Sequence, residues 1–253
     1  MGKNKLKKFA DMATFGCVLQ YPREVLLQEG FPYFGKWNEH FFKNDGLITL
    51  ELGCGKGEYT VALAKANPER NYIGVDVKGA RMWSGAREVE ENGIGNAAFL
   101  RAEIENIDRF FAPGEVDEIW ITFPDPQMQK TRKRLTSTRF LKMYGQFLRP
   151  GGLINLKTDS PFLFEYTRRL AELNGFEIDF ITDDLYGSGK ADPVTSIKTY
   201  YESQWLSRGK KIKLIKMRVK DFDNLQEPPS DDIERDDYRA YPRHTVIKSE
   251  VGI

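Results

Sequence analysis

A glycine-rich segment followed by an acidic residue has the residue types and spacing of a nucleoside-binding site. Glu51-Leu-Gly-Cys-Gly-Lys-Gly57 has three glycines at alternate positions, which let the backbone turn tightly and approach a ligand closely. Asp76 follows 21 residues after Gly55, at the distance where a carboxylate accepts hydrogen bonds from ribose hydroxyls. The pattern indicates an adenosine-bearing cofactor. In the alternative interpretation the glycines only shape a turn and Asp76 caps the following helix.

The residues around these glycines favour a methyl donor over two other ligand classes. Glu58 stands where a nicotinamide-binding loop has its third glycine, and Lys56 is followed by Gly57, not by the hydroxyl residue of a phosphate-binding loop. S-Adenosylmethionine carries an adenosine and an amino acid but no phosphate, so acidic neighbours suit it. Glu51 is expected to hold its ammonium group, directly or through water. Glu103 is expected to accept from the adenine amino group or to shape its pocket, unless it is only a solvated carboxylate.

A second segment, Phe123-Pro-Asp-Pro126, holds Asp125 on a stiff turn because proline restricts the backbone on both sides. A fixed carboxylate at a strand end suggests a reaction centre, although a Pro-Asp turn also bonds its own amides. Four basic side chains follow within residues 130–134, and a second basic run covers residues 208–220. A charge run alone is usually a solvated face, but beside a reaction centre these runs favour recognition of nucleic-acid phosphates.

The sequence between residues 46 and 220 predicts the fold that positions these side chains. Runs of β-branched residues alternate there with helical segments, a pattern typical of strands and helices that follow one another in an α/β protein. We expect an α/β fold with a doubly wound, Rossmann-like, mainly parallel sheet of seven strands, the last antiparallel. Ligands bind such sheets beyond the carboxyl ends of the strands, which is where the motifs stand. The predicted strands are 47–52, 72–75, 97–102, 118–123, 153–157, 177–182 and 212–219. The predicted helices are 58–66, 80–92, 137–148 and 162–173.

Two further motifs, Leu156-Lys-Thr-Asp159 and Thr199-Tyr-Tyr-Glu202, complete a set that resembles the bacterial tRNA (guanine-N7-)-methyltransferase family over about residues 45–220. This is a class I family, and the resemblance implies methyl transfer from S-adenosylmethionine to N7 of a guanine in the tRNA variable loop. By the same resemblance, the residues lining the cofactor would be Glu51, Gly53, Gly55, Asp76, Glu103 and Asp125. The residues meeting the nucleotide would be Lys130, Asp159, Thr199, Tyr200, Tyr201 and Glu202.

The sequence departs from the family's motif after Pro126. Gln127 replaces the family's tryptophan and the segment is two residues shorter, so either Lys130 or Gln129 occupies the position of the RNA-contacting lysine.

The chemistry of methyl transfer to N7 depends little on proton transfer. Guanine N7 presents a free lone pair, so we expect catalysis to consist mainly of positioning the methyl group and N7 in line, without a general base. Asp125 is the catalytic candidate, either favouring the positive charge that develops on the purine or anchoring the base. The alternatives are a non-catalytic RNA-binding protein and a nicotinamide-dependent oxidoreductase.

The composition of the chain limits the class of protein and the kinds of site that it can contain. The 253 residues carry 38 Lys and Arg against 37 Asp and Glu, which excludes a histone-like polyelectrolyte. Two cysteines exclude a disulfide scaffold and a zinc-thiolate site, and no apolar run approaches the length of a membrane span. We therefore expect a cytoplasmic protein without metal, with tRNA as partner, as a monomer or homodimer. The expected parts are a basic extended arm with irregular or helical cover (1–45), the methyltransferase domain (46–220) and an acidic, extended tail (221–253).

Overall fold

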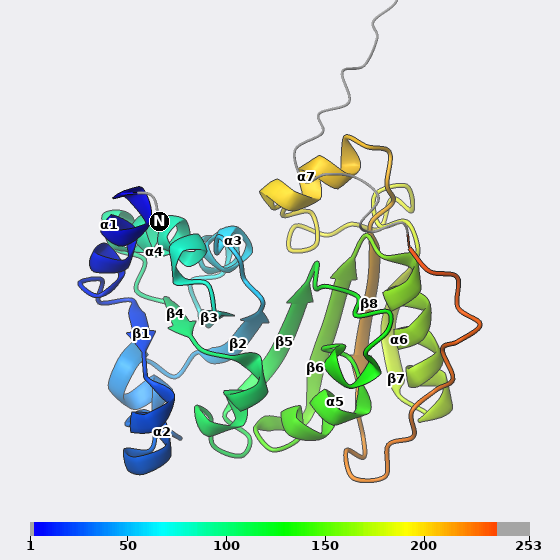
Figure 1. Ribbon diagram of the computed structural model, residues 1–253, viewed down its shortest axis with the longest axis horizontal. Coiled ribbons are helices and arrows are strands. Elements are labelled where there is room, and N and C mark those ends of the chain that lie inside the picture. Colours follow the sequence, from blue (N-terminus) through cyan, green and yellow to red (C-terminus); the bar gives the residue numbers. More distant parts are fainter. Residues whose placement is uncertain (1–2, 237–253) are drawn as a thin grey trace, which may run out of the picture.

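A central β-sheet organises residues 3–236, the part of the chain that the structure, a computed structural model, describes, with side chains from residue 7 onward (Figure 1). Its strands are β1 (Val18–Gln20), β2 (Leu47–Leu52), β3 (Arg70–Asp76), β4 (Ala97–Arg101), β5 (Val116–Thr122), β6 (Leu148–Thr158), β7 (Glu177–Thr182) and β8 (Lys213–Arg218). These eight strands of the described range lie in the order β1-β4-β3-β2-β5-β6-β8-β7. All neighbours from β1 to β6 are parallel, whereas β8 is antiparallel to both β6 and β7. The predicted α/β class, mainly parallel sheet and antiparallel last strand are confirmed.

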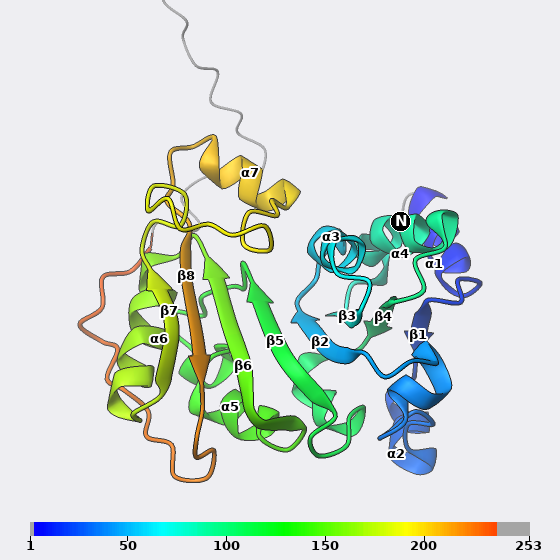
Figure 2. The same ribbon diagram turned by 180° about the vertical axis from the view of Figure 1, so that it is seen from behind.

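Helices cover both faces of this sheet. They are α1 (Lys3–Met12), α2 (Arg23–Glu29), α3 (Glu58–Ala66), α4 (Gly79–Asn92), α5 (Thr138–Tyr144), α6 (Pro161–Leu173) and α7 (Tyr200–Leu206), with the short helices η1 (Trp37–Phe42), η2 (Ile104–Arg109) and η3 (Thr131–Lys133). Because side chains alternate along a strand, Ile119 and Ile121 of β5 join the core that contains Leu163 of α6, and Trp120 joins the core that contains Tyr59 of α3. Figure 1 shows α5 and α6 in front of the sheet and α7 beyond the carboxyl ends of β5 and β6; Figure 2 shows these strands from behind, in front of α5 and α6.

The N-terminal segment differs from the prediction in two ways. Residues 3–12 form helix α1, which packs on α4, where an extended arm was expected. Strand β1 adds an eighth strand to the predicted seven by pairing with β4, with Val18 opposite Phe99. Three residues carry too little alternation to be recognised as a strand in the sequence, and β1 forms because β4 leaves an edge for it.

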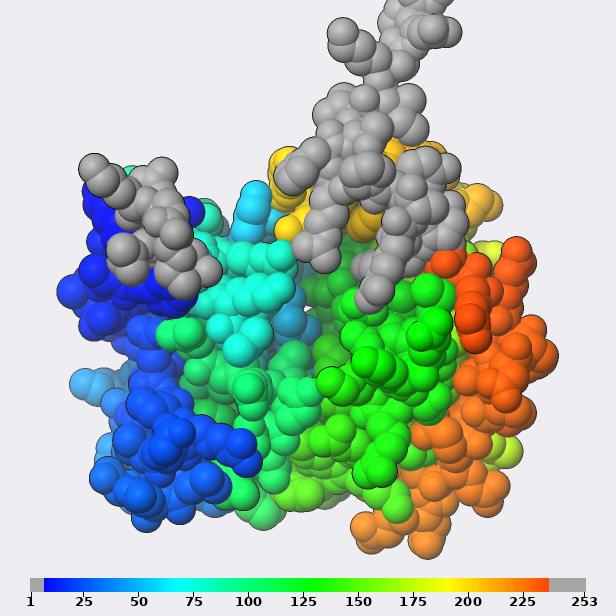
Figure 3. All heavy atoms as spheres, viewed as in Figure 1, coloured from blue at the N-terminus to red at the C-terminus, as the bar shows by residue number. Residues whose placement is uncertain are grey.

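The C-terminal half follows the sequence pattern more closely. Ser160 caps α6 by accepting a hydrogen bond from the Leu163 amide, and Pro161 occupies the first helical position, as these helix-start residues predict. Helix α5 ends at Tyr144, earlier than predicted, because Leu148 already pairs with Val116 at the start of β6. Residues 221–236 contain no helix or strand, and Figure 3 shows them in orange and red along the flank of the molecule. Residues 237–253 of the predicted tail lie outside the described range.

Candidate active site

The glycine loop connects β2 to α3, and Asp76 at the end of β3 holds it in place. Asp76 Oδ2 accepts a hydrogen bond from the Gly55 amide at 3.0 Å, and Oδ1 accepts one from the Lys78 amide at 2.7 Å. The glycines Gly53, Gly55 and Gly57 all have positive φ angles, which glycine adopts without strain. Asp76 therefore positions the loop and keeps lone pairs available, because a carboxylate accepts about four hydrogen bonds.

The three glycines face different surroundings. A Cβ atom at Gly57 would lie 2.4 Å from the ring of Phe99, so this glycine is required for packing against the core. A Cβ atom at Gly53 would meet nothing within 4 Å, and one at Gly55 would meet only the Gly53 carbonyl oxygen at 4.0 Å. The backbone at Gly53 and Gly55 therefore borders open space in which a ligand fits.

Glu51 lies in the protein interior beside this loop. Alternation along β2 turns it away from Leu50 and toward α3, where its Oε2 accepts hydrogen bonds from Thr60 N at 3.0 Å and Thr60 Oγ1 at 2.5 Å. Its Oε1 accepts a third hydrogen bond from Thr122 Oγ1 at 2.7 Å. Burial raises the pKa of Glu51 to about 7, although these hydrogen bonds act in the opposite direction. Thr60 and Thr122 are site residues that the sequence interpretation missed.

Glu103 follows β4 at the rim of a separate concavity. Its side chain is exposed and accepts a hydrogen bond from Asn106 Nδ2 at 3.2 Å. A cavity of about 540 Å³ lies beside it, and its lining includes Val77, directly after Asp76, together with Ala102 and Tyr21. This volume falls in the range of small-molecule sites. The structure thus brings the predicted adenosine-binding positions to the carboxyl ends of adjacent strands.

The segment that follows β5 is strained. Phe123 and Gln127 both have φ of +48°, a conformation that non-glycine residues rarely adopt. Asp125 lies between them with an exposed side chain, and its Oδ1 accepts a hydrogen bond from the Gln127 amide at 3.0 Å. Backbone strain of this kind concentrates at functional sites, where the surrounding structure enforces it.

Arg134 enforces part of that conformation, and this corrects one expectation. We expected the whole basic run to face nucleic acid, but Arg134 is only 1% exposed. Its guanidinium donates to the carbonyl oxygens of Gln127 at 3.3 Å and Met128 at 2.9 Å. The other basic side chains of the run, and Gln129, are exposed. Arg134 is therefore a structural clamp on the loop of residues 123–130.

Asp159, just beyond the end of β6, is a buried acid. It is 2% exposed, and neither carboxylate oxygen has a hydrogen-bond partner among the described residues. Burial raises its pKa to about 6; Asp236 adds to the increase, and Lys210 and Lys213 oppose it. Buried polar groups are normally satisfied, so this carboxylate is an exception among the described residues.

The Thr199–Glu202 segment has two functions in the structure. Thr199 and Glu202 form a capping box that begins α7, and Glu202 is fully buried. Glu202 also forms an ion pair with Lys157 Nζ at 2.9 Å and accepts a hydrogen bond from Tyr186 Oη at 2.6 Å. The sequence interpretation missed Lys157, whose only signal is a lysine inside an apolar strand.

Tyr200 and Tyr201, between these two residues, are 49% and 38% exposed. The Tyr200 amide donates to Glu58 Oε2 at 2.8 Å, and Lys56 Nζ lies 3.9 Å from the centre of the Tyr200 ring. The glycine loop therefore contacts α7, so the two halves of the predicted site adjoin.

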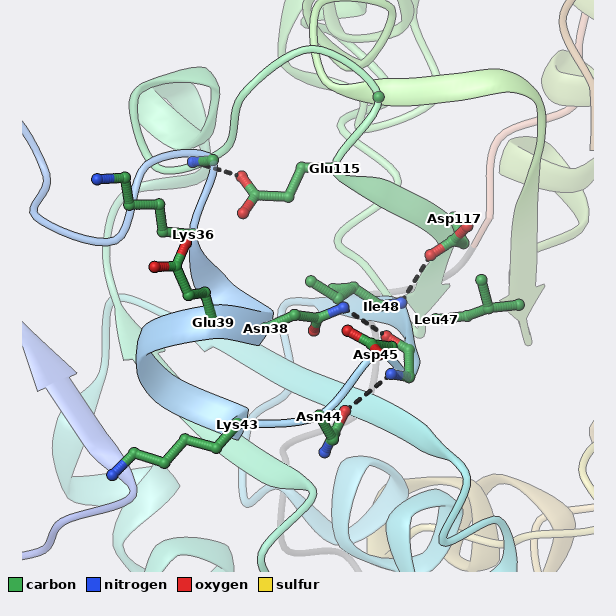
Figure 4. A pocket seen from close by; sticks show the side chains of 13 residues that line it. Lys36, Asn38, Glu39, Lys43, Asn44, Asp45, Leu47, Ile48, Glu115 and Asp117 are labelled. Carbon is green, nitrogen blue, oxygen red and sulfur yellow. Dashed lines mark hydrogen bonds between the residues drawn. The ribbon is translucent and has the colours of Figure 1, made fainter.

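A cavity of about 730 Å³ at the opposite, amino end of β2 and β5 contains none of the predicted site residues (Figure 4). Its polar groups bond one another: Glu115 accepts from the amides of Gly35 and Trp37, and Asp117 accepts from the Ile48 amide. Ligands of open α/β sheets bind at the other end, so this cavity is not the candidate site.

Two other kinds of site are absent from residues 3–236. No group of three or more His, Cys, Asp or Glu side chains could hold a metal ion. No helix has both the length and the apolar composition needed to span a membrane.

Known proteins resemble this chain over nearly its whole length. A family model described as "Putative methyltransferase" matches residues 45–215. A tRNA (guanine-N(7)-)-methyltransferase of Bacteroides thetaiotaomicron is 56% identical over 96% of this chain and 96% of its own length. The Porphyromonas gingivalis protein of the same name is 57% identical over 92% of this chain and 96% of its own length.

Solved structures agree with the fold. The 16S rRNA methyltransferase KamB matches with a TM-score of 0.56 over 76% of this chain and 95% of its own, at 17% identity. At that identity the likeness concerns the fold alone. The family match and the identity and coverage of the relatives decide the classification: this chain belongs to the tRNA (guanine-N7-)-methyltransferase family.

Proposed function

We propose that this enzyme transfers a methyl group from S-adenosylmethionine to N7 of a guanine in the variable loop of tRNA. The names of its relatives support the reaction. The observation that carries the proposal for this chain is Asp159, a buried carboxylate at the carboxyl edge of the sheet whose oxygens have no hydrogen-bond partner among residues 3–236. Membership of a methyltransferase family argues against the nicotinamide-dependent alternative, and a tRNA substrate would place the protein in the cytoplasm.

The residues at the ends of β2, β3 and β4 fit S-adenosylmethionine, which supplies a methyl group activated by its positive sulfonium. Asp76 would accept hydrogen bonds from the ribose hydroxyls with its remaining lone pairs. The cavity beside Val77 and Glu103 would take the adenine. The open space at Gly53 would take the amino-acid part, with the buried carboxyl group of Glu51 nearby. Each part of the donor thus has a chemically matched place on the protein.

Asp159 would select guanine on the acceptor side. The Watson-Crick edge of guanine presents two adjacent donors, N1-H and the 2-amino group, which match the two oxygens of one carboxylate. Adenine presents one donor, its 6-amino group, beside an acceptor at N1, so it would leave one oxygen of Asp159 unpaired at a cost of about 1–3 kcal/mol. Guanine N7 lies on the opposite side of the purine and remains free for methyl transfer. Asp125, exposed on the neighbouring strand end, would stabilise the charge that develops there.

The rest of the tRNA would bind the exposed residues around this edge. Lys130, Arg132 and Lys133 are exposed and suit phosphate contacts, and Tyr200 and Tyr201 suit stacking on bases. N7 faces the deep, narrow major groove in A-form RNA, where side chains reach poorly. A guanine in a loop or turned out of a helix is therefore the expected target.

The proposal is tested by incubating the purified protein with methyl-labelled donor and unmodified tRNA transcripts, then locating the labelled base after nuclease digestion. The matched control is a transcript in which 7-deazaguanine replaces the target guanine, because it removes only the accepting nitrogen. We expect label in 7-methylguanine from the first transcript and none at that position in the second. Binding without transfer would favour the non-catalytic alternative, and equal labelling of both transcripts would exclude N7 as the acceptor.

A further inference from the structure

The acidic C-terminal segment contacts the protein at defined points. Residues 226–236, here named the C-terminal strap, run along α6 from its last turn to its first. At the first residue of the strap, the Gln226 amide donates to Oδ1 of Asn174, which follows the last turn of α6, at 2.7 Å. Midway, Asp232 accepts from Arg169 Nη1 at 2.8 Å, and Ile233 is 7% exposed. The strap is therefore packed on α6 through both charge complementarity and an apolar anchor.

The upper end of the strap reaches the turn that carries Asp159. Asp236 Oδ1 accepts a hydrogen bond from the Phe162 amide at 2.9 Å, and Oδ2 accepts one from Ser160 Oγ. Ser160 Oγ in turn accepts from the Leu163 amide at 2.9 Å. Asp236 thus fixes the side chain that caps α6, one residue after Asp159.

The middle of the strap reaches the strained loop on the neighbouring strand. Ser230 Oγ accepts a hydrogen bond from Arg134 Nη1 at 3.1 Å. The same guanidinium holds the carbonyl oxygens of Gln127 and Met128 and lies over the Tyr166 ring of α6 at 4.3 Å. Ser230 therefore completes the clamp that keeps Asp125 and the residues after it in place.

We propose that the C-terminal strap is a positioning element of the acceptor site, with Asp236 and Ser230 as its positioning residues. The inference rests on the proposed function. The strap orients Asp159 through the Ser160 turn, and it orients the loop of residues 123–130 through Arg134. One segment of the chain thereby sets the relative placement of the guanine-holding acid and the loop that carries Asp125.

The electrostatics of Asp159 give a readout that simple packing would not change. The charged groups that face Asp159 are Lys210 and Lys213, which lower its pKa, and Asp236, which raises it. Neutralising Asp236 should therefore lower the pH at which Asp159 ionises. Asp232 is the matched control, because it also carries one negative charge and bonds α6, but its partner Arg169 bonds to Glu165 of the same helix and not to the Ser160 turn or to Arg134.

The experiment compares D236N, S230A and D232N in the full-length protein, after their free energies of unfolding have been measured. We expect D236N and S230A each to raise the KM for tRNA by about tenfold, the effect of one oriented hydrogen bond, without changing the affinity for the methyl donor. D236N should also shift the acid limb of the pH-activity profile to lower pH, whereas S230A should leave it in place. D232N should change neither quantity.

Amide hydrogen exchange supplies a readout that does not need activity. S230A should speed exchange at the Gln127 and Lys130 amides, which bond within the clamped loop, and D232N should not. If the wild-type protein methylated no tRNA, the proposed function would fail while this exchange difference would still support the strap's link to the loop. If S230A and D236N matched D232N in KM, pH profile and exchange, the strap would be only a cover for α6 and the inference would be overturned.

Discussion

Replacing Asp159 with asparagine should stabilise the protein and disable it at the same time. Burial raises the pKa of Asp159 from 3.8 to about 6, a difference of about 2. At 1.36 kcal/mol per unit, keeping this carboxylate ionised at neutral pH costs about 3 kcal/mol of folding free energy. A buried asparagine amide without a partner costs about 1–2 kcal/mol. The charge penalty is larger, so D159N should gain about 1–2 kcal/mol at pH 7.5.

The pH dependence of that gain follows from the direction of the shift. Since the folded protein holds the Asp159 proton up to about pH 6 and the unfolded chain releases it near 3.8, the wild-type free energy of unfolding falls as pH rises between these values. D159N lacks this loss. Its advantage should be greatest above pH 6 and should shrink as the pH falls toward 4.

Urea denaturation of both proteins at pH 7.5 and pH 5 measures this difference, and D125N is the control because it makes the same substitution at an exposed aspartate. Steady-state methylation of tRNA should show a loss of at least about a hundredfold in kcat/KM for D159N, because the amide offers guanine one neutral acceptor in place of two charged ones and sets its own NH2 group against the second donor. A D159N protein less stable than wild type at pH 7.5 would refute the unpaired-charge reasoning. A stabilised variant with normal kcat/KM would refute the contact with guanine.

Two further changes test neighbouring features. K157M removes one partner of a fully buried ion pair and leaves the charge of Glu202 unpaired, so it should lower the free energy of unfolding by about 3–5 kcal/mol in urea denaturation. The double variant K157M/E202Q should recover most of this loss. A double variant as unstable as K157M would contradict the explanation. K133A should lower the slope of log binding constant against log salt for tRNA by about 1, whereas K43A, an exposed lysine at the other end of the sheet, should leave the slope unchanged. Equal slopes for the two variants would show that Lys133 makes no phosphate contact.

The sequence predicts this fold well wherever the evidence is local. The bounds of β2 and α3 coincide with their predictions because an apolar run, a glycine loop and a helical pattern follow one another directly. Helix α6 ends at the predicted Leu173 and begins one residue before the predicted 162, at the proline expected in its first turn. In contrast, β1 depends on the free edge of β4, about eighty residues away, and no local pattern reports that edge.

The candidate site shows the same division. Sequence motifs identify which acids stand at strand ends, because each motif directly follows its strand along the chain. They do not distinguish Arg134 from Lys133, two basic neighbours of which one is buried and one exposed. Burial of Arg134 depends on Ser230 and on the rings of α6, which reach it only in the folded protein. The C-terminal segment was expected as an acidic tail, and its contacts with the site could be found only in three dimensions.

Lys157 and Asp159 illustrate how the structure separates stability from function. Both are buried charged residues within three positions of one strand end, yet Lys157 has an acid, a carbonyl-rich loop and a tyrosine around it, whereas Asp159 has no hydrogen-bond partner among the described residues. Asp236 lies where it raises the pKa of Asp159 further, so it adds to the cost of that charge. An arrangement optimised for stability alone would place hydrogen-bond donors against both oxygens of Asp159 or replace it with an apolar residue. The unpaired acid and the acidic strap beside it are explained together if this edge of the sheet is built to receive the two donors of a guanine base.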